Sequence, residues 1–144
     1  MMQIMRRPRV MIYDDDQIVL DMLKIFFTRR GYEVFDYIEP VVCPLKKNPS
    51  ESCDNQPCVD VIISDYQMPK MTGIELLQNQ SKKGCKVDSK MKAIMSGYSD
   101  DHIITQCNEL GYSFFQKPFT FSKLSAWLSE HEKLFDLSQQ FAEN

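Results

Sequence analysis

The stretch Val10-Met11-Ile12-Tyr13-Asp14-Asp15-Asp16 runs from four apolar residues straight into three aspartates. An apolar run without polar alternation is typical of a strand that is buried on both faces of a parallel sheet. A second run, Val61-Ile62-Ile63-Ser64, leads in the same way into Asp65. Carboxylates gathered at strand ends repel one another, so we expect a divalent cation and a basic side chain to compensate them.

The rest of the chain alternates between strand-like and helix-like segments. Apolar residues at helical spacing follow the first strand, as at Val19, Met22 and Phe26. The segment between Tyr37 and Val59 lacks this spacing and is rich in Pro, Cys, Asn and Ser, which predicts a loop or a short helix there. Five strands separated by helices predict an α/β fold with a doubly wound parallel sheet. The predicted strands cover residues 10–13, 32–37, 59–64, 92–95 and 113–116.

Capping residues predict where the helices begin and end. Ser99, just before two aspartates, is a predicted N-cap, and Thr120 is predicted to cap the last helix. The apolar spacing of that last helix continues as far as Phe141, which predicts a helical C-terminal tail. Three helices are predicted to end at glycines, namely Gly31, Gly84 and Gly111.

Size and charge argue against several functions. The 144 residues suit one domain, and the net charge of −3 gives no electrostatic reason to expect nucleic-acid binding. There is no apolar run of about 18 residues, so we expect no membrane span. The start of the chain does not resemble a signal peptide. We therefore expect a cytoplasmic protein with no membrane partner and no direct DNA binding.

Several polar positions should meet at one rim of the sheet. The aspartates after Tyr13 come at the carboxyl end of a predicted strand, and so do Asp65, Ser96 and Lys117. Ligands of open α/β sheets bind at this rim. A carboxylate that is neutralised by a cation and lies beside a lysine can accept a phosphoryl group. The sequence therefore predicts a phosphoryl-acceptor site here.

Five motifs, in this order, resemble the receiver domain of two-component response regulators. They are Tyr13-Asp14-Asp15-Asp16, Ser64-Asp65-Tyr66-Gln67-Met68-Pro69, Met71-Thr72-Gly73, Met95-Ser96-Gly97-Tyr98-Ser99-Asp100 and Lys117-Pro118-Phe119. The resemblance implies a five-stranded flavodoxin-like sheet with strand order 2-1-3-4-5. It implies a receiver domain over residues 9–130, preceded by an extension of residues 1–8 and followed by a helical tail of residues 131–144.

The resemblance also implies the roles of individual residues. Asp65 is the expected acceptor of a phosphoryl group from a sensor histidine kinase or a phosphotransfer protein. Ser96 and Lys117 are expected to contact that group once it is transferred. The expected Mg²⁺ ligands are Asp14, Asp15, Asp65 and the backbone carbonyl of Gln67.

The switch of the family is expected to use Ser96 and Phe114. Many members have Tyr at the second position, so here packing rather than a hydroxyl group has to carry the change. The Lys117–Pro118 peptide bond is expected to be cis, as it often is in this family.

Signal output is expected through a protein partner. In the family, partners usually dock on a face that corresponds here to residues 100–110, 113–116 and 121–130. Only a short tail follows this face, so we expect a stand-alone receiver that switches partner binding or relays the phosphoryl group. We expect no enzymatic activity beyond its own phosphorylation and dephosphorylation.

Two other functions fit part of the pattern. Haloacid-dehalogenase-like phosphatases also carry an Asp-x-Asp pair after the first strand, and Asp14 with Asp16 has that spacing, with Asp14 as the nucleophile. The chain lacks room for the cap of those enzymes. The second alternative is a receiver-like module that is never phosphorylated, and the intact set of site residues argues against it.

The cysteines allow two interpretations. Cys43, Cys53, Cys58 and Cys85 could converge at the opposite rim as a site for structural zinc or an iron–sulfur cluster. Their spacing does not match paired C-x-x-C motifs, which favours the other interpretation, free or partly disulfide-linked thiols in a loop. Cys107 lies on an apolar helix face and is predicted to be part of the core.

Overall fold

The computed structural model describes residues 5–45, 57–97 and 100–138. Its strands are β1 (Arg9–Tyr13), β2 (Glu33–Tyr37), β3 (Val61–Asp65), β4 (Lys92–Ser96) and β5 (Ser113–Gln116). Its α-helices are α1 (Gln17–Arg29), α2 (Gly73–Lys82), α3 (Asp101–Leu110) and α4 (Phe121–His131). All strand pairs are parallel, in the order β2-β1-β3-β4-β5. The predicted flavodoxin-like order is confirmed.

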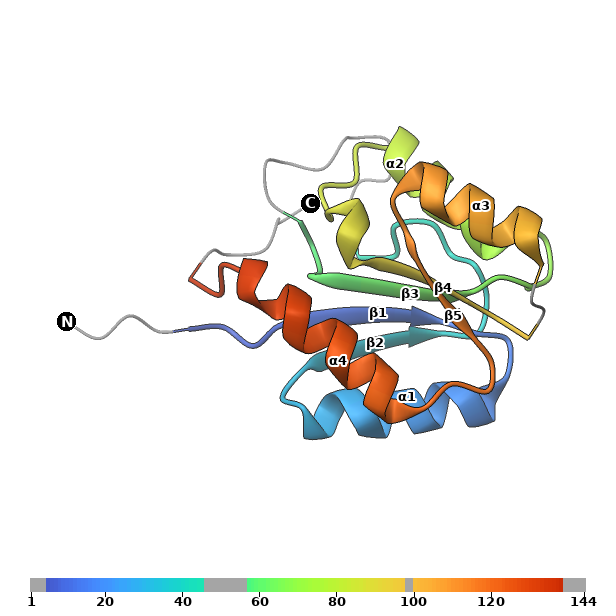
Figure 1. Cartoon of the computed structure of the whole chain (residues 1–144). Coiled ribbons are helices and arrows are strands. Elements are labelled where there is room, and N and C mark those ends of the chain that lie inside the picture. The colour runs from blue at the N-terminus through green and yellow to red at the C-terminus, as the bar shows by residue number, and fades with distance from the viewer. Residues whose placement is uncertain (1–4, 46–56, 98–99, 139–144) are drawn as a thin grey trace.

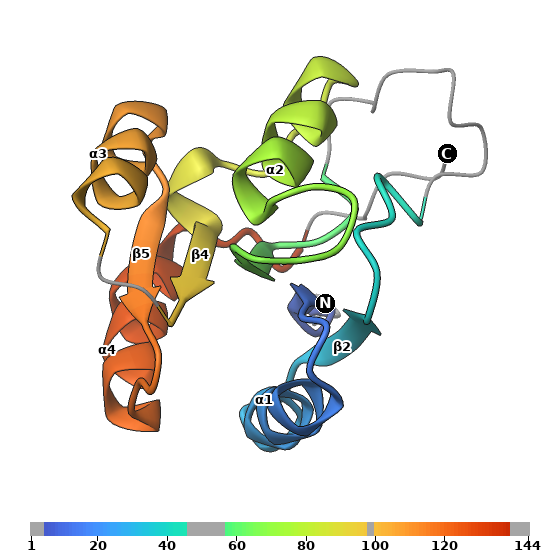
Figure 2. The same ribbon diagram turned by 90° about the vertical axis from the view of Figure 1, so that its right-hand side faces the viewer.

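The sheet lies between two layers of helices. Helices α1 and α4 cover one face, and α2 and α3 cover the other (Figure 1, Figure 2). Every residue of β3 and of β4 is buried, and β1 is buried after its first residue. This burial explains the apolar runs in the sequence, since strands covered on both faces have no room for polar alternation.

Side-chain caps define the helix ends. Thr72 and Glu75 form a reciprocal capping box at α2, and Thr120 accepts a hydrogen bond from the Lys123 N–H, as predicted for the last helix. The predicted N-cap of α3 is wrong. Asp100 is the N-cap and accepts from the His102 N–H, while Ser99 lies outside the described residues. Both residues suit a cap chemically, so the sequence pattern missed the helix start by one residue.

The predicted absence of a regular helix between β2 and β3 holds for the described residues 38–45 and 57–60. The start of this connection is fixed to the sheet. The Tyr13 hydroxyl donates a hydrogen bond of 2.7 Å to the carbonyl of Val41. The connection therefore leaves β2 along the same face of the sheet that Tyr13 occupies.

Within the described part of the predicted helical tail, helical structure continues only as far as Leu134. Helix α4 ends at His131, and a single 3₁₀ turn, Glu132–Leu134, follows it. The chain then meets the N-terminal arm, where the Arg6 N–H donates to the Leu137 carbonyl at 2.9 Å. Arg6 also forms a two-point ion pair with Asp60, with both distances 2.8 Å. The Leu137 carbonyl is thus bound to the N-terminal arm, and residues 139–144 lie outside the described part.

Candidate functional site

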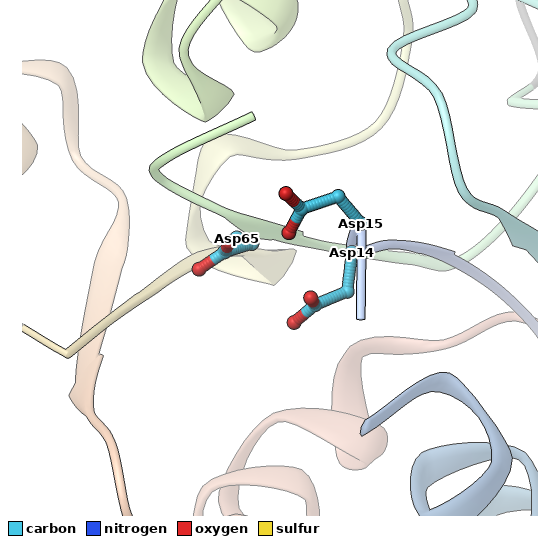
Figure 3. A group of neighbouring side chains, drawn as sticks. All are labelled: Asp14, Asp15 and Asp65. Atoms are coloured by element: carbon cyan, nitrogen blue, oxygen red, sulfur yellow. The ribbon is translucent and has the colours of Figure 1, made fainter. Parts of the chain in front are cut away.

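The carboxyl ends of the strands bring the predicted site residues to one rim. Asp14 follows β1, Asp65 ends β3, Ser96 ends β4, and Lys117 follows β5. The side chains of Asp14, Asp15 and Asp65 gather at this rim (Figure 3), and one carboxylate oxygen from each lies within 4.8 Å of the others. Residues far apart in the sequence therefore form one acidic group, as the strand pattern predicts.

Asp14 is the most constrained member of this group. It is completely buried, and its own N–H donates to the Tyr37 carbonyl at 3.2 Å. One carboxylate oxygen accepts from the Asp16 N–H at 2.9 Å. The other accepts from the Lys117 Nζ at 2.7 Å. With both oxygens engaged, Asp14 is held in a single orientation.

Lys117 links the two buried carboxylates. Its Nζ lies 2.7 Å from Asp14 and 3.2 Å from Asp65, and its backbone N–H donates to the Ser96 carbonyl at 2.7 Å. Burial acts to lower the pKa of Lys117, but its hydrogen bonds to the two carboxylates and their charges outweigh burial and raise it. The ammonium group is thus a fixed positive charge within the site.

Asp65 has an unusual protonation equilibrium. Burial, and next the charge of Asp14, raise its pKa to about 6, although Lys117 acts in the opposite direction. One lysine does not compensate three carboxylates that lie this close together. Without a further cation, the group therefore carries unresolved repulsion at neutral pH.

The end of β3 is fixed by backbone contacts with its neighbours. The Tyr66 N–H donates to the Met95 carbonyl at 2.7 Å, and the Gly73 N–H donates to the Tyr66 carbonyl at 2.8 Å. A Cβ atom at Gly73 would lie 2.3 Å from the Asp65 carbonyl oxygen and 2.9 Å from the Ser64 Oγ. Only glycine permits this approach. The sequence pattern indicated a turn here but not the contact with Asp65.

A cleft of about 740 Å³ opens beside the acidic group. It is lined by Asp15, Asp65, Gln67, Met68, Pro69, Gly97 and Lys117. Asp15 is exposed and Asp65 is buried with 7% of its surface exposed, and both line the cleft, so the cleft leads from solvent to the Asp65 carboxylate. Three carboxylates provide the hard oxygen ligands that Mg²⁺ prefers, and the excess negative charge favours a divalent cation. The residues present therefore fit a magnesium site.

Other predicted residues occupy the expected elements. Ser96 is buried at the end of β4, and Phe114 is half-buried on β5 opposite Ile94. Their switching stays a prediction. The Lys117–Pro118 peptide bond is cis, as expected.

The four-cysteine metal site is not supported. Within the described residues, the acidic group is the one set of three or more His, Cys, Asp or Glu side chains close enough to share an ion. Cys43, Cys58 and Cys85 do not form such a set, and Cys53 lies outside the described part. Cys107 is buried in the core, as predicted, and burial raises its pKa to about 11.

A five-stranded parallel sheet in this order, with an acidic group and a lysine at its carboxyl rim, defines a receiver of the flavodoxin-like class. The chain belongs to the response regulator receiver domain family, whose model matches residues 10–129. Members of this family are signalling modules of two-component systems. No match was found among curated proteins. Within the described residues, no helix has the length and apolarity needed to span a membrane.

Solved structures with the same fold include three receiver domains. One is a response regulator receiver domain protein from Clostridium thermocellum, with 23% identity, a TM-score of 0.65 and coverage of 88% of this chain and 98% of that one. Another is the signal receiver domain of a putative Luxo repressor protein from Vibrio parahaemolyticus, with 18% identity, a TM-score of 0.72 and coverage of 89% of this chain and 92% of that one. The third is a CheY-like response regulator receiver domain protein from Methanospirillum hungatei JF-1, with 23% identity, a TM-score of 0.68 and coverage of 90% of this chain and 99% of that one. At these identities the likeness shows the fold.

Gly73→Ala should destabilise the protein, because its methyl group meets the Asp65 carbonyl. We expect the free energy of unfolding in urea to fall by about 1–3 kcal/mol. Gly97→Ala is the matched control at the same cleft, since a Cβ there meets nothing within 4 Å. Equal stability losses in the two variants would contradict the close approach at Gly73.

Asp65→Asn should stabilise the metal-free protein at neutral pH. The folded pKa of about 6 exceeds the ordinary value of 3.8, so the charged carboxylate costs stability above about pH 6 and not below about pH 4. In chelator at about pH 7.5, we expect a gain of about 1–2 kcal/mol in urea unfolding, which shrinks as the pH falls toward 4.

Asp15→Asn serves as the control for this charge effect, because Asp15 is exposed and its charge acts least on Asp65. The gain in the free energy of unfolding should be smaller for Asp15→Asn than for Asp65→Asn. The repulsion would be refuted if, in chelator at neutral pH, the free energy of unfolding of Asp65→Asn were equal to or lower than that of the parent chain.

Proposed function

We propose that Asp65 accepts a phosphoryl group from the phosphohistidine of a sensor histidine kinase or phosphotransfer protein, in a Mg²⁺-dependent reaction. The observation that carries this proposal is the position of Asp65. Its carboxylate lies 3.2 Å from the Lys117 ammonium and lines the cleft that opens to solvent. A group that must meet an external phosphorus atom needs both access and a nearby positive charge.

The geometry favours Asp65 over Asp14 as the acceptor. Asp14 is completely buried, and both of its oxygens already accept hydrogen bonds. An attacking oxygen must approach phosphorus in line, which a buried carboxylate in this position does not permit. The same observation argues against the phosphatase alternative, in which Asp14 is the nucleophile.

The proposed transfer requires little proton chemistry. An oxygen of the Asp65 carboxylate forms a bond to phosphorus while the bond from phosphorus to the histidine nitrogen breaks, and the imidazole leaves with that electron pair. Lys117 offsets the negative charge on the phosphoryl oxygens, and the Ser96 hydroxyl donates to one of them in the product. Asp65 must be ionised to attack, so it needs the cationic environment that lowers its pKa.

Mg²⁺ would be held by Asp14, Asp15, Asp65 and the backbone carbonyl of Gln67. When bound, it neutralises the carboxylates and the incoming phosphoryl oxygens. Asp14 contributes a fixed, buried charge, whereas exposed Asp15 stands at the entrance of the cleft.

Output would pass from the rim to the face formed by α3, β5 and α4. Ser96 and β5 are joined through the 2.7 Å bond from the Lys117 N–H to the Ser96 carbonyl, and Phe114 lies three residues before that lysine. Because Phe114 has no hydroxyl, a change in ring packing has to carry the signal. The changed face would then bind a downstream protein or return the phosphoryl group to a relay partner.

A groove beside the cleft suits the phosphodonor. It has a volume of about 510 Å³ and runs between α1 and the loop that follows β5, lined by Val19, Met22, Leu23 and residues 117–121. Ile18, Met22 and Ile25 are exposed apolar residues of α1. Lys117 lines both the groove and the cleft, so a donor seated on the apolar helix face lies next to Asp65.

Incubation with acetyl phosphate and Mg²⁺ should add one phosphoryl group to the chain, measured by intact mass. Asp65→Asn should remove the labelling, because among the described residues no other carboxylate has both access and the contact with Lys117. Asp16→Asn is the matched control, since Asp16 caps α1 and asparagine caps equally well. Persistent labelling of Asp65→Asn, or its loss in Asp16→Asn, would overturn the assignment.

Met22→Lys should slow labelling by a phosphorylated kinase by about tenfold, because it places a charge in the apolar groove. Labelling by acetyl phosphate, which needs no docking, should stay unchanged. Leu134→Lys alters another exposed apolar residue, which lies in the 3₁₀ turn, and should leave both rates unchanged. If Met22→Lys slows labelling by both the kinase and acetyl phosphate to the same extent, Met22 affects the phosphorylation site itself, and the proposed docking groove is wrong.

A further inference from the structure

Ser64 is a buried polar residue of β3 that the proposed transfer does not use. It is completely buried, and it stands directly before Asp65. Its hydroxyl donates a hydrogen bond of 2.9 Å to the backbone carbonyl of Asp65. The sulfur of Met68 lies 4.0 Å from the same hydroxyl oxygen and is a weak acceptor. Because a hydroxyl has only one proton to donate, the short bond to the Asp65 carbonyl takes it.

The Asp65 carbonyl belongs to the peptide unit that joins Asp65 to Tyr66. The N–H of this same unit donates to the Met95 carbonyl of β4 at 2.7 Å. The peptide group is planar, so a bond at its oxygen and a bond at its nitrogen together fix the orientation of the whole unit. The hydroxyl of Ser64 therefore holds one end of this unit, and β4 holds the other.

The next peptide unit along the chain is held as well. The Tyr66 carbonyl accepts from the Gly73 N–H at 2.8 Å, and a Cβ atom at Gly73 would lie 2.9 Å from the Ser64 Oγ. The backbone thus follows a fixed path from Asp65 to Gln67, which is exposed and lines the cleft. Among the proposed Mg²⁺ ligands, the Gln67 carbonyl is the backbone oxygen, so its direction depends on the two units before it.

Ser64 makes the one bond of these three that comes from a side chain. The other two join backbone groups and do not depend on which side chains stand at those positions. The residue on which Ser64 acts is Asp65, which is both the proposed phosphoryl acceptor and a proposed metal ligand. A substitution at Ser64 therefore loosens the backbone beneath the site without removing a ligand from it.

We propose that Ser64 is a positioning residue for the magnesium site. Its hydroxyl holds the peptide unit after Asp65 so that the Asp65 carboxylate and the Gln67 carbonyl reach the same ion. This inference rests on the proposed function, because it concerns the ion that the transfer requires. Residues that orient metal ligands typically change metal affinity by about 10- to 100-fold when they are substituted. Since two backbone bonds remain when the hydroxyl is lost, we expect the lower end of this range.

A buried hydroxyl can also have a purely structural role, and Ser113 provides the comparison. Its Oγ accepts a hydrogen bond of 2.9 Å from the Trp127 Nε1. Ser113 begins β5, whereas the proposed site lies beyond the other end of that strand. Ser113→Ala removes a serine hydroxyl from a strand of the same sheet and leaves the rim intact. It is therefore the matched control for Ser64→Ala.

The test measures Mg²⁺ binding to the full, unphosphorylated chain by isothermal titration calorimetry. Ser64→Ala should raise the dissociation constant for Mg²⁺ by about tenfold, whereas Ser113→Ala should leave it unchanged. Ser64→Cys keeps the shape of the side chain with a weaker donor, so its affinity should fall between those of the parent chain and Ser64→Ala. Without Mg²⁺, amide hydrogen exchange at Tyr66 should be faster in Ser64→Ala than in the parent chain.

Labelling by acetyl phosphate gives a second reading of the same role. Ser64→Ala should need about tenfold more Mg²⁺ to reach half of its maximal rate, while the maximal rate at saturating Mg²⁺ stays that of the parent chain. A general loss of stability would not shift the Mg²⁺ requirement in this way. Ser113→Ala should show the parent chain's dependence on Mg²⁺.

Two results would overturn the positioning role. One is a Ser64→Ala chain that binds Mg²⁺ as tightly as the parent chain, and the other is an equal loss of affinity in Ser64→Ala and Ser113→Ala. If Ser64→Ala does not fold, Ser64→Cys decides in its place, and an affinity equal to that of the parent chain contradicts the proposal. A parent chain that binds Mg²⁺ but is not labelled on Asp65 would refute the phosphoryl transfer and leave this inference standing. A parent chain that does not bind Mg²⁺ would refute both.

Discussion

The mutual repulsion of carboxylates at the rim is the constraint on which the site depends. Three of them lie within 4.8 Å, one is completely buried, and the Lys117 ammonium is shared between two. The fixed Lys117 ammonium offsets part of the repulsion. The raised pKa of Asp65 indicates that the lysine does not remove all of it. The rim therefore favours the binding of an additional cation, which is what a phosphoryl acceptor assisted by magnesium requires.

The backbone around the site keeps the repelling groups from moving apart. Asp14 is tied through its N–H to the end of β2 and through its carboxylate to Asp16 and Lys117. Gly73 closes in the end of β3 so tightly that a Cβ atom there would lie 2.3 Å from the Asp65 carbonyl oxygen. Strands that are buried on both faces resist relaxation, because a shift would open cavities in the core. Packing energy elsewhere thus offsets the electrostatic cost at the rim.

Much of this arrangement can be read from the sequence, because strand ends in a parallel sheet share one edge. The apolar runs before Asp14 and Asp65, and Lys117 after a third run, suffice to predict their meeting. The features that were missed depend on contacts made across the fold. Ser99 and Asp100 are equally good caps, so the sequence does not decide between them, and the bond from Arg6 to Leu137 joins the N-terminal arm to the segment after α4. Spacing alone likewise cannot tell whether cysteines converge.

Two aspartates with the same chemistry have different surroundings, because Asp14 is completely buried whereas Asp65 lines the cleft. Asp14 has no access to solvent, and both of its carboxylate oxygens accept hydrogen bonds from fixed partners. Asp65 keeps access to the cleft and carries the raised pKa that results from this neighbour. A cation that binds the rim makes Asp65 fully ionised and relieves the repulsion in the same event. The repulsion lowers the stability of the metal-free fold. Because a bound cation relieves it, the same repulsion raises the affinity for the cation, so stability without metal and affinity for metal oppose each other.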